Sequence, residues 1–255
     1  MSQDILFWIL AAIATFLVGA SKGGLPGIGI LAVPILSQAI SPVMAAGLLL
    51  PLYVLSDIYG LWLYRRDYNL ALIKLMTFAA CIGIAIGWAT ARFNNDALVK
   101  LMVGVIGIWY TADLIWKTSR RVAAKPAPPS IPRGLFWGTL AGFTSFVAHA
   151  GGTPFQMYVL PQKLDKMTYA GTIQITFAII NLLKLPPYWS LGQINVLSLW
   201  MCVYLAPVAM AGAWAGHRFT RIMPEKTFFK WVEAALFLVS LKLIWDAFNG
   251  FGFLV

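Results

Sequence analysis

GASKGGLPGIG, residues 19–29, and HAGGTP, residues 149–154, are the two stretches that decide how this chain folds. Each follows an apolar run, and each holds the same Gly-Gly-x-Pro pattern, which interrupts a helix. The second pattern begins 128 residues after the first. Two further pairs keep the same order at offsets of 126 and 129 residues: WATARF (88–93) with WAGHRF (214–219), and LIW (114–116) with LIW (243–245). This ordered self-similarity indicates a duplicated domain with one helix break in each copy.

The composition is that of a helical membrane protein. Of the 255 residues, 60% are hydrophobic and only 11% are charged, and the mean hydropathy is +0.78. A soluble domain of this size has too little interior to hide so much apolar surface. The formal net charge of +10 is spread over short loops, so we expect a lipid bilayer as partner and no nucleic acid. Two cysteines in apolar runs predict neither a disulfide framework nor a metal site.

We predict an all-α fold with five segments in each copy. Three segments of each copy are transmembrane helices, and the other two form a broken or re-entrant hairpin around the Gly-Gly pair. The predicted segments are 4–21, 26–37, 42–64, 69–92 and 96–117, then 134–149, 154–162, 167–189, 195–217 and 225–248. The domains are a first membrane repeat at 1–117, a basic, proline-rich linker at 118–133 and a second membrane repeat at 134–255.

The positions of the basic residues predict the topology. Most lysines and arginines lie in the linker and in three short loops, near 65–66, 163–166 and 218–226. With these loops in the cytoplasm, the two repeats are inverted and both chain termini are outside a bacterial inner membrane. The hairpins then enter from opposite faces, so the two Gly-Gly pairs meet near the middle of the bilayer. It stays open whether 4–21 and 134–149 span the membrane fully.

The glycines of the breaks, Gly23, Gly24, Gly151 and Gly152, are predicted to bind substrate. They leave the backbone open to close approach, and the helix that follows each break presents unpaired N–H groups and a partial positive charge. This arrangement suits an anion. Thr153 is placed to cap the second of these helices and is also predicted to bind the substrate. The alternative is that the glycines only allow close helix crossings, as small residues do in membranes.

Two ionisable residues adjoin the breaks, Lys22 at the first and His149 at the second. Ionisable groups inside a membrane are expensive, so both are predicted to contact the anion. His149 is also suited to carrying a proton. The alternatives are that Lys22 extends to the membrane surface and that His149 makes a hydrogen bond between packed helices.

Further polar residues complete the predicted site. Asp57 and Asn181 occupy equivalent places in the two repeats, and Gln174 lies seven residues before Asn181, on the same helix face. Gln156 lies in the first turn after the second break. The three amides are predicted to bind an oxyanion, the alternative being that they orient the breaks. Asp57 is predicted to pair with Lys22 or to take a coupling proton, the alternative being a helix-end charge near the arginines that follow it.

Arg92 and Arg218 match across the repeat and are predicted to take part in coupling or gating. The alternative is an interfacial anchor, because a tryptophan lies four residues before each arginine.

The pattern Gly-x-x-Lys-Gly-Gly-x-Pro-Gly-x-Gly, its second-half echo and the helix layout resemble the sulfite exporter TauE/SafE family, also called the 4-toluene sulfonate uptake permeases. The resemblance extends over essentially the whole chain. It implies a transporter that moves sulfite or an organosulfonate, often outward. The second copy lacks the lysine of the first, so it stays open whether both halves contact the substrate equally.

We therefore predict a secondary transporter, an exporter, of a small sulfur oxyanion. The residues themselves indicate an anion, and the resemblance supplies the sulfur. We expect no enzyme activity and no cofactor, and leave open a proton or sodium as coupling ion and a homodimer as assembly. The alternatives are a transporter of another small anion and a membrane-embedded enzyme, for which two histidines and two scattered cysteines give poor support.

Overall fold

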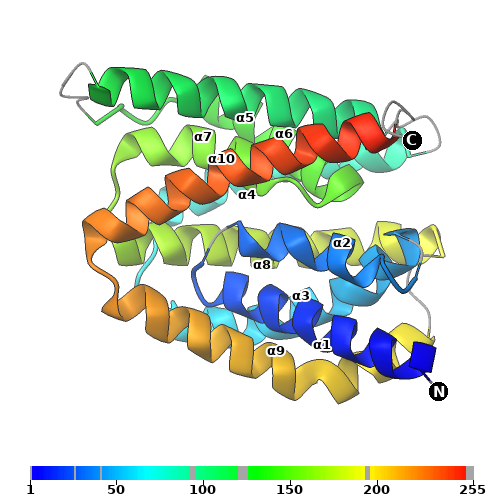
Figure 1. The fold of residues 1–255 in the computed structure, drawn as a ribbon. Coiled ribbons are helices and arrows are strands. Elements are labelled where there is room, and N and C mark those ends of the chain that lie inside the picture. Colours follow the sequence, from blue (N-terminus) through cyan, green and yellow to red (C-terminus); the bar gives the residue numbers. More distant parts are fainter. Residues whose placement is uncertain are drawn as a thin grey trace. The chain divides into compact units, whose positions relative to one another are not determined.

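The computed structural model describes residues 2–25, 27–40, 42–91, 96–119, 126–192 and 196–250. These residues form helices joined by short connections, with no strand among them, as the all-α prediction requires (Figure 1). The elements in chain order are α1 (Ser2–Lys22), the 3-10 helix η1 (Ile28–Leu31), α2 (Ala32–Leu36), α3 (Pro42–Leu63), α4 (Leu70–Ala89), α5 (Asp96–Ser119), α6 (Ile131–Ala148), α7 (Gly152–Val159), the 3-10 helix η2 (Leu160–Gln162), α8 (Lys166–Ser190), α9 (Val196–Ile222) and α10 (Glu225–Gly250).

The helix ends lie close to the predicted segment ends, with two informative differences. α9 continues to Ile222 instead of ending at 217, because no glycine or proline lies between position 217 and Pro224. α6 begins at Ile131 instead of 134, because Pro132 favours the first turn of a helix. The predicted residues Pro26 and Arg92 and the middle of the linker, 120–125, lie outside the described residues.

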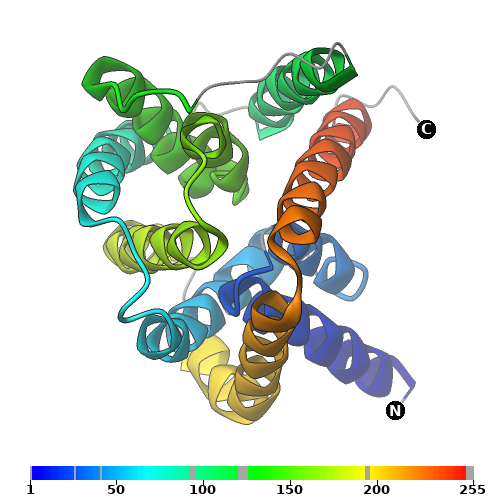
Figure 2. The ribbon, with the colours of Figure 1, turned by 90° about the vertical axis from the view of Figure 1, so that its left-hand side faces the viewer.

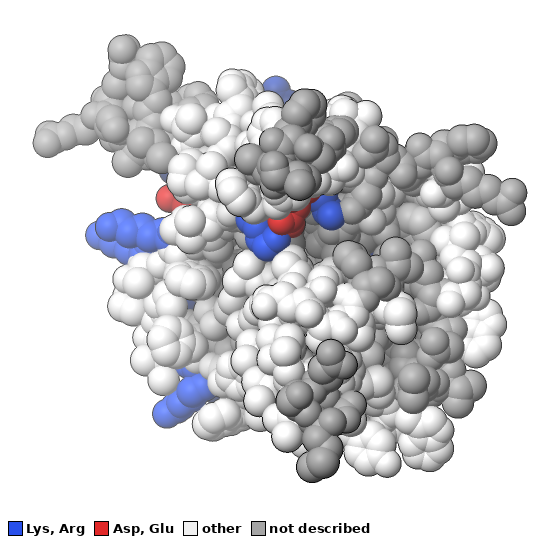
Figure 3. Space-filling model, turned by 45° about the vertical axis from the view of Figure 1, so that its right-hand side comes forward, with Lys and Arg blue, Asp and Glu red and all other residues white. Residues whose placement is uncertain are grey.

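Several helices have the length and surface of membrane spans. Within the described ranges, three helices contain stretches long and apolar enough to cross a bilayer: Ile5–Lys22, Leu70–Ala89 and Leu199–Ile222. Many large apolar side chains are exposed, including Trp109 and Trp200. On the face in Figure 3, most of the described side chains carry no charge. An apolar exterior of this kind is what lipid requires and what water disfavours.

The chain forms two compact units, each built from stretches that are distant in the sequence. The first unit contains Met1–Asn69 and Met167–Phe228, so it holds α1, α2, α3, α8 and α9. The second unit contains Leu70–Lys166 and Phe229–Val255, so it holds α4, α5, α6, α7 and α10. Each unit therefore combines helices from both predicted repeats.

In the first unit, α1 lies against α9 in a glycine-lined crossing (Figures 1 and 2). A Cβ atom on Gly19 would lie 2.0 Å from the Ala209 carbonyl oxygen, and one on Gly23 would lie 2.3 Å from the Ala213 carbonyl oxygen. Gly212 and Gly216 make the same close approach from α9. Both helices thus carry glycines four residues apart, which lets their backbones touch. Gly23 therefore has the packing role that the alternative describes, and its contact with substrate stays a prediction.

The second unit contains a comparable crossing between α4 and α6. A Cβ atom on Gly83 would lie 2.0 Å from the Thr139 carbonyl oxygen, and one on Gly142 would lie 2.2 Å from the Ala80 carbonyl oxygen. In both units, a helix that leads to a break packs on the fourth segment of the other predicted repeat. The close crossings hold the helix that precedes each break in a fixed position.

Candidate functional site

The first break lies at the carboxyl end of α1. Gly23 continues the helical pattern, since its N–H donates to the Gly19 carbonyl oxygen over 2.9 Å. Gly24 then turns the chain with a φ of 106°, which side chains other than glycine rarely adopt. The Tyr64 hydroxyl donates to the Gly23 carbonyl oxygen over 2.6 Å, and a Cβ on Gly24 would lie 2.1 Å from that hydroxyl. Tyr64 therefore satisfies a helix-end carbonyl that would otherwise lack a partner.

Lys22 points into the first unit and forms a buried ion pair. Its Nζ atom lies 2.8 Å from Oδ1 of Asp57 on α3. The two residues are only 5% and 2% exposed, so water contributes little to screening the pair. The predicted pairing of Asp57 with Lys22 is confirmed, and the alternative that Lys22 reaches the membrane surface is wrong.

Two amides of α8 complete the partners of the Asp57 carboxylate. Gln174 donates its Nε2 to Oδ1 over 2.9 Å, and Asn181 donates its Nδ2 to Oδ2 over 2.7 Å. Gly60, one turn after Asp57, leaves the space that Gln174 occupies, because a Cβ there would lie 2.2 Å from its Nε2. The carboxylate is thus held by one ammonium and two amides, in place of the helix-end arginines that the alternative proposed.

Lys184 is the member of this cluster that the sequence analysis missed. It lies on α8, is 1% exposed and is close enough for the charges of Lys22 and Asp57 to act on it. Its signal was present in the sequence: an ionisable residue inside an apolar helix, three residues after Asn181 and therefore on the same face. Among the side chains whose burial the structure describes, the buried charged ones are Lys22, Asp57 and Lys184, and all three belong to the first unit.

Tyr53 links the cluster to the chain that follows the break. The Lys22 ammonium lies over its ring, 5.2 Å from the ring centre, which is a cation–π geometry. The Tyr53 hydroxyl donates to the Gly29 carbonyl oxygen over 2.9 Å. This hydrogen bond ties α3 to the short helical segment that begins at Ile28.

The second break has a different backbone from the first. α6 ends at Ala148, and His149 turns the chain with a φ of 51° in the left-handed region. The Ala150 N–H donates back to the Thr144 carbonyl oxygen over 3.1 Å. Gly151 precedes α7 and Gly152 is its first residue. The same Gly-Gly letters therefore end a helix at the first break and begin one at the second.

Thr153 does not cap α7, contrary to the prediction. The residue before the helix is Gly151, and Thr153 lies inside the first turn, because α7 begins two residues before the predicted 154. Its methyl group packs near Gly107 of α5, where a Cβ would approach it to 3.1 Å. Its hydroxyl oxygen is buried and has no hydrogen-bond partner within the described structure.

Gln156 provides a second unsatisfied polar atom at the same helix end. Its Oε1 is buried without a hydrogen-bond partner among the described residues, and the side chain as a whole is 3% exposed. The side chain folds back toward the start of α7, so that its Nε2 would lie 3.9 Å from a Cβ on Gly152. Unsatisfied buried polar atoms are costly and point to a missing ligand or water.

The structure thus brings the predicted residues together in two groups. Lys22, Asp57, Gln174 and Asn181 form one buried cluster in the first unit. The second group, in the second unit, consists of His149, Gly151, Gly152, Thr153 and Gln156. Arg218 belongs to neither, since its side chain is exposed on α9.

Comparison with known families covers most of the chain. The family model described as sulfite exporter TauE/SafE matches residues 11–243. The chain belongs to this family. The matched range includes both helix breaks and every member of the buried cluster, and it confirms the resemblance seen in the sequence. The apolar helices and the membership in an exporter family together make this an integral membrane protein of the transporter type. No curated protein and no solved structure matches the chain.

Proposed function

We propose that this TauE/SafE family member is a secondary transporter that exports a small sulfur oxyanion, such as sulfite or an organosulfonate, through the buried cluster around Lys22. One observation carries the proposal. Among the side chains whose burial the structure describes, the buried basic and acidic groups of the first unit are two lysines, Lys22 and Lys184, and one carboxylate, Asp57. A buried site with more basic than acidic side chains favours an anion.

Electrostatics explains why this imbalance favours an anion. A charge transferred from water into a low-dielectric interior loses several kcal/mol of solvation, and only nearby opposite charge or good hydrogen bonds offset that loss. Asp57 compensates one ammonium, at 2.8 Å from Lys22. A sulfite or sulfonate group beside Lys22 would add negative charge next to a buried ammonium, and its oxygens accept hydrogen bonds well.

Asp57 is the residue through which binding of the substrate is best coupled to binding of an ion. An oxyanion that approaches Lys22 competes with the Asp57 carboxylate for the same ammonium. Both carboxylate oxygens already face N–H donors, from Lys22, Gln174 and Asn181, so the cluster repels a second cation such as sodium. A proton on Asp57 would release Lys22 toward the substrate. A proton is therefore the coupling ion that this geometry favours.

We also propose that the amino end of α7, within the second unit, binds an oxyanion. Its first N–H groups have no partner inside the helix, and the helix dipole places partial positive charge there. The unsatisfied Thr153 hydroxyl can donate to an oxygen of the anion, and so can the Gln156 amide after rotation of its end group. The two breaks would then contribute differently, the first by charge and the second by neutral donors.

The positive-inside pattern supports a proposed orientation in a bacterial inner membrane. With the basic loops in the cytoplasm, both termini are outside and the repeats are inverted. The exchange of helices between repeats in each unit is compatible with this arrangement.

Replacing Lys184 by methionine is the sharpest test of the proposal. The change removes a buried charge and keeps the length of the side chain, so we expect the melting temperature to stay the same or rise. Sulfite affinity should fall about tenfold or more, because a charged partner of the anion is lost. Thermal unfolding in detergent and flux of labelled sulfite in proteoliposomes measure the two effects.

Lys74→Met is the matched control, because Lys74 is an exposed lysine on α4 outside both groups. It should leave sulfite flux unchanged. Wild-type proteoliposomes that carry no sulfite or sulfonate flux above empty liposomes would contradict the proposed function. Flux of a different small anion in the same assay would identify another substrate for the same site.

Thr153→Val tests the contact at α7. Valine keeps the shape of threonine and removes an unsatisfied hydroxyl, so the protein should melt at the same or a higher temperature. Sulfite flux should fall, because one donor to the anion is lost. Thr15→Val is the control, since the Thr15 hydroxyl is also buried without a partner in the described structure but lies away from both breaks on α1. Equal flux in the two variants would remove Thr153 from the site.

A further inference from the structure

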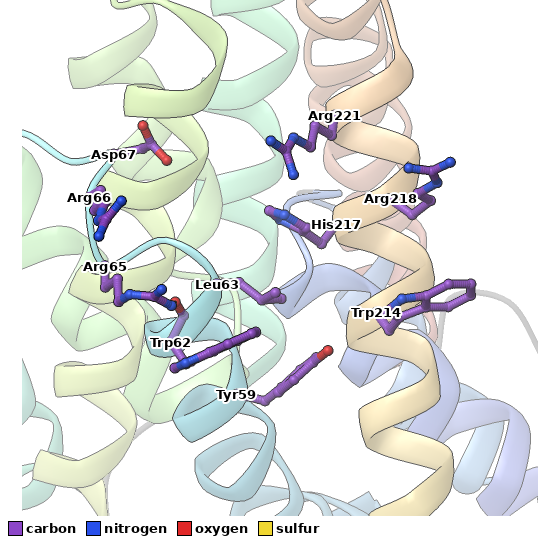
Figure 4. Close-up of a pocket in the computed structure, with 10 residues that line it drawn as sticks. All are labelled: Tyr59, Trp62, Leu63, Arg65, Arg66, Asp67, Trp214, His217, Arg218 and Arg221. Carbon is purple, nitrogen blue, oxygen red and sulfur yellow. The ribbon is translucent and has the colours of Figure 1, made fainter.

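A basic pocket lies beside the first break, in the first unit. It has a volume of about 440 Å³ and opens between the end of α3 and the end of α9. Its charged lining consists of four arginines and one aspartate: Arg65, Arg66, Arg218, Arg221 and Asp67 (Figure 4). The excess of positive charge follows from the extension of α9 to Ile222, which places two arginines on a helix beside the arginines that follow α3.

The side chains around the pocket suit an anionic group. In Figure 4, His217 and Arg221 point from α9 toward the side of Arg65 and Asp67. The Arg65 guanidinium lies over the Trp62 ring, 4.9 Å from the ring centre, and its Nη1 donates to the Trp62 carbonyl oxygen over 2.8 Å. Guanidinium groups bind oxyanions through paired N–H donors. His217 adds a buried Nδ1 atom with no hydrogen-bond partner in the described structure.

A short series of contacts connects this pocket with the buried cluster. The His217 ring meets the Tyr64 ring edge to face, with 5.1 Å between ring centres. The Tyr64 hydroxyl donates to the Gly23 carbonyl oxygen over 2.6 Å, and Gly23 follows Lys22 directly. Tyr64 is fully buried, so it separates the open pocket from the ion pair.

We propose that this pocket is a second oxyanion site, distinct from the buried cluster, which binds a sulfite-like, sulfonate or phosphate group in contact with water. The binding site itself does not depend on transport. Its role as an entry or exit site for the substrate, next to Tyr64, rests on the proposed function. The bound group has two sources, a free anion in solution and the headgroup of an anionic lipid, and these share the same chemistry.

The test uses the full-length protein in nanodiscs. In phosphatidylcholine nanodiscs at low salt, calorimetry should show sulfite binding to the wild-type protein. The Arg65→Gln/Arg221→Gln variant should bind sulfite at this site about tenfold or more weakly. The control is Arg133→Gln/Lys74→Gln, which removes two exposed charges outside the pocket. It should bind sulfite as the wild type does, and all three proteins should melt at similar temperatures.

A second arm identifies the source of the anion. If a lipid headgroup occupies the pocket, phosphatidylglycerol nanodiscs should raise the melting temperature of the wild type and of the control, but not that of the pocket variant. The proposal is overturned if the pocket variant matches the control in both arms. The proposed transport function fails separately, through absence of flux in wild-type proteoliposomes, so the two failures are distinguishable.

Discussion

Replacing Asp57 by asparagine should lower the free energy of unfolding by about 3–5 kcal/mol. The change leaves the ammonium groups of Lys22 and Lys184 without the carboxylate that compensates them in the buried cluster. Gln174 and Asn181 also lose the charged acceptor for their amide donors. Breaking a buried pair from one side is more harmful than removing both partners, because a bare charge stays inside. Unfolding of the purified protein in detergent, followed by circular dichroism, measures the loss.

Two comparisons show whether the loss is electrostatic. The Lys22→Met/Asp57→Leu variant should lose less stability than Asp57→Asn alone, because it removes the buried charges in a pair. Sulfite should raise the melting temperature of Asp57→Asn more than that of the wild type, since an anion replaces the missing negative charge. If the double variant lost as much unfolding free energy as Lys22→Met and Asp57→Leu together, the two residues would not be coupled. Failure of sulfite to stabilise Asp57→Asn would count against an anion site at Lys22.

Part of the buried cluster could be predicted from the sequence: repeat alignment singled out Asp57 and Asn181, and Asp57 was predicted to pair with Lys22. Asp57 and Asn181 fall at equivalent places in the two copies, and they touch in the structure over 2.7 Å. Lys22 stood out because an ionisable group inside an apolar run needs a compensating partner. The helix ends followed from Gly, Pro and apolar run length, so most segments matched within a few residues.

Other features of the site could not be predicted from the sequence, because they depend on how distant helices pack together. Lys184 has no equivalent charged residue in the motif pairs, and only the side-by-side placement of α3 and α8 shows that it joins the cluster. The arginine pocket depends on the packing of the end of α9 beside the arginines that follow α3, which the sequence does not show. The cap predicted at Thr153 failed for a similar reason, because glycine is tolerated in a first turn and α7 starts at Gly152.

The duplicated Gly-Gly pattern shows the limit of a motif most clearly. At the first break, Gly23 lies in a backbone crossing and Gly24 adopts a positive φ. At the second break, His149 takes the left-handed position and Gly151 has ordinary helical angles. The same Gly-Gly pair therefore adopts different backbone conformations at the two breaks, because different neighbouring residues pack against it. A sequence repeat predicts where a chain breaks better than it predicts the backbone at the break.

Alanine substitutions at Gly23 and Gly152 should change stability in opposite directions. A Cβ on Gly23 would lie 2.3 Å from the Ala213 carbonyl oxygen and 2.5 Å from the His217 nitrogen. Both are backbone atoms that cannot rotate away, so α1 and α9 must separate. We expect Gly23→Ala to cost about 3 kcal/mol of unfolding free energy, at the upper end for overpacking. Melting temperature and the fraction of monodisperse protein after purification measure this loss.

Gly152→Ala should instead leave the fold intact or stabilise it by about 0.5–1 kcal/mol, because alanine restricts the unfolded chain and Gly152 already has helical geometry. A Cβ there meets only the Gln156 Nε2, at 3.9 Å, which is an ordinary contact. Its methyl group would nevertheless occupy the amino end of α7, where the anion is proposed to bind. Sulfite flux should therefore fall in a protein that is as stable as the wild type. If Gly152→Ala kept full flux, the space in front of α7 would not be needed for the substrate, and the glycine at the second break would serve only the turn.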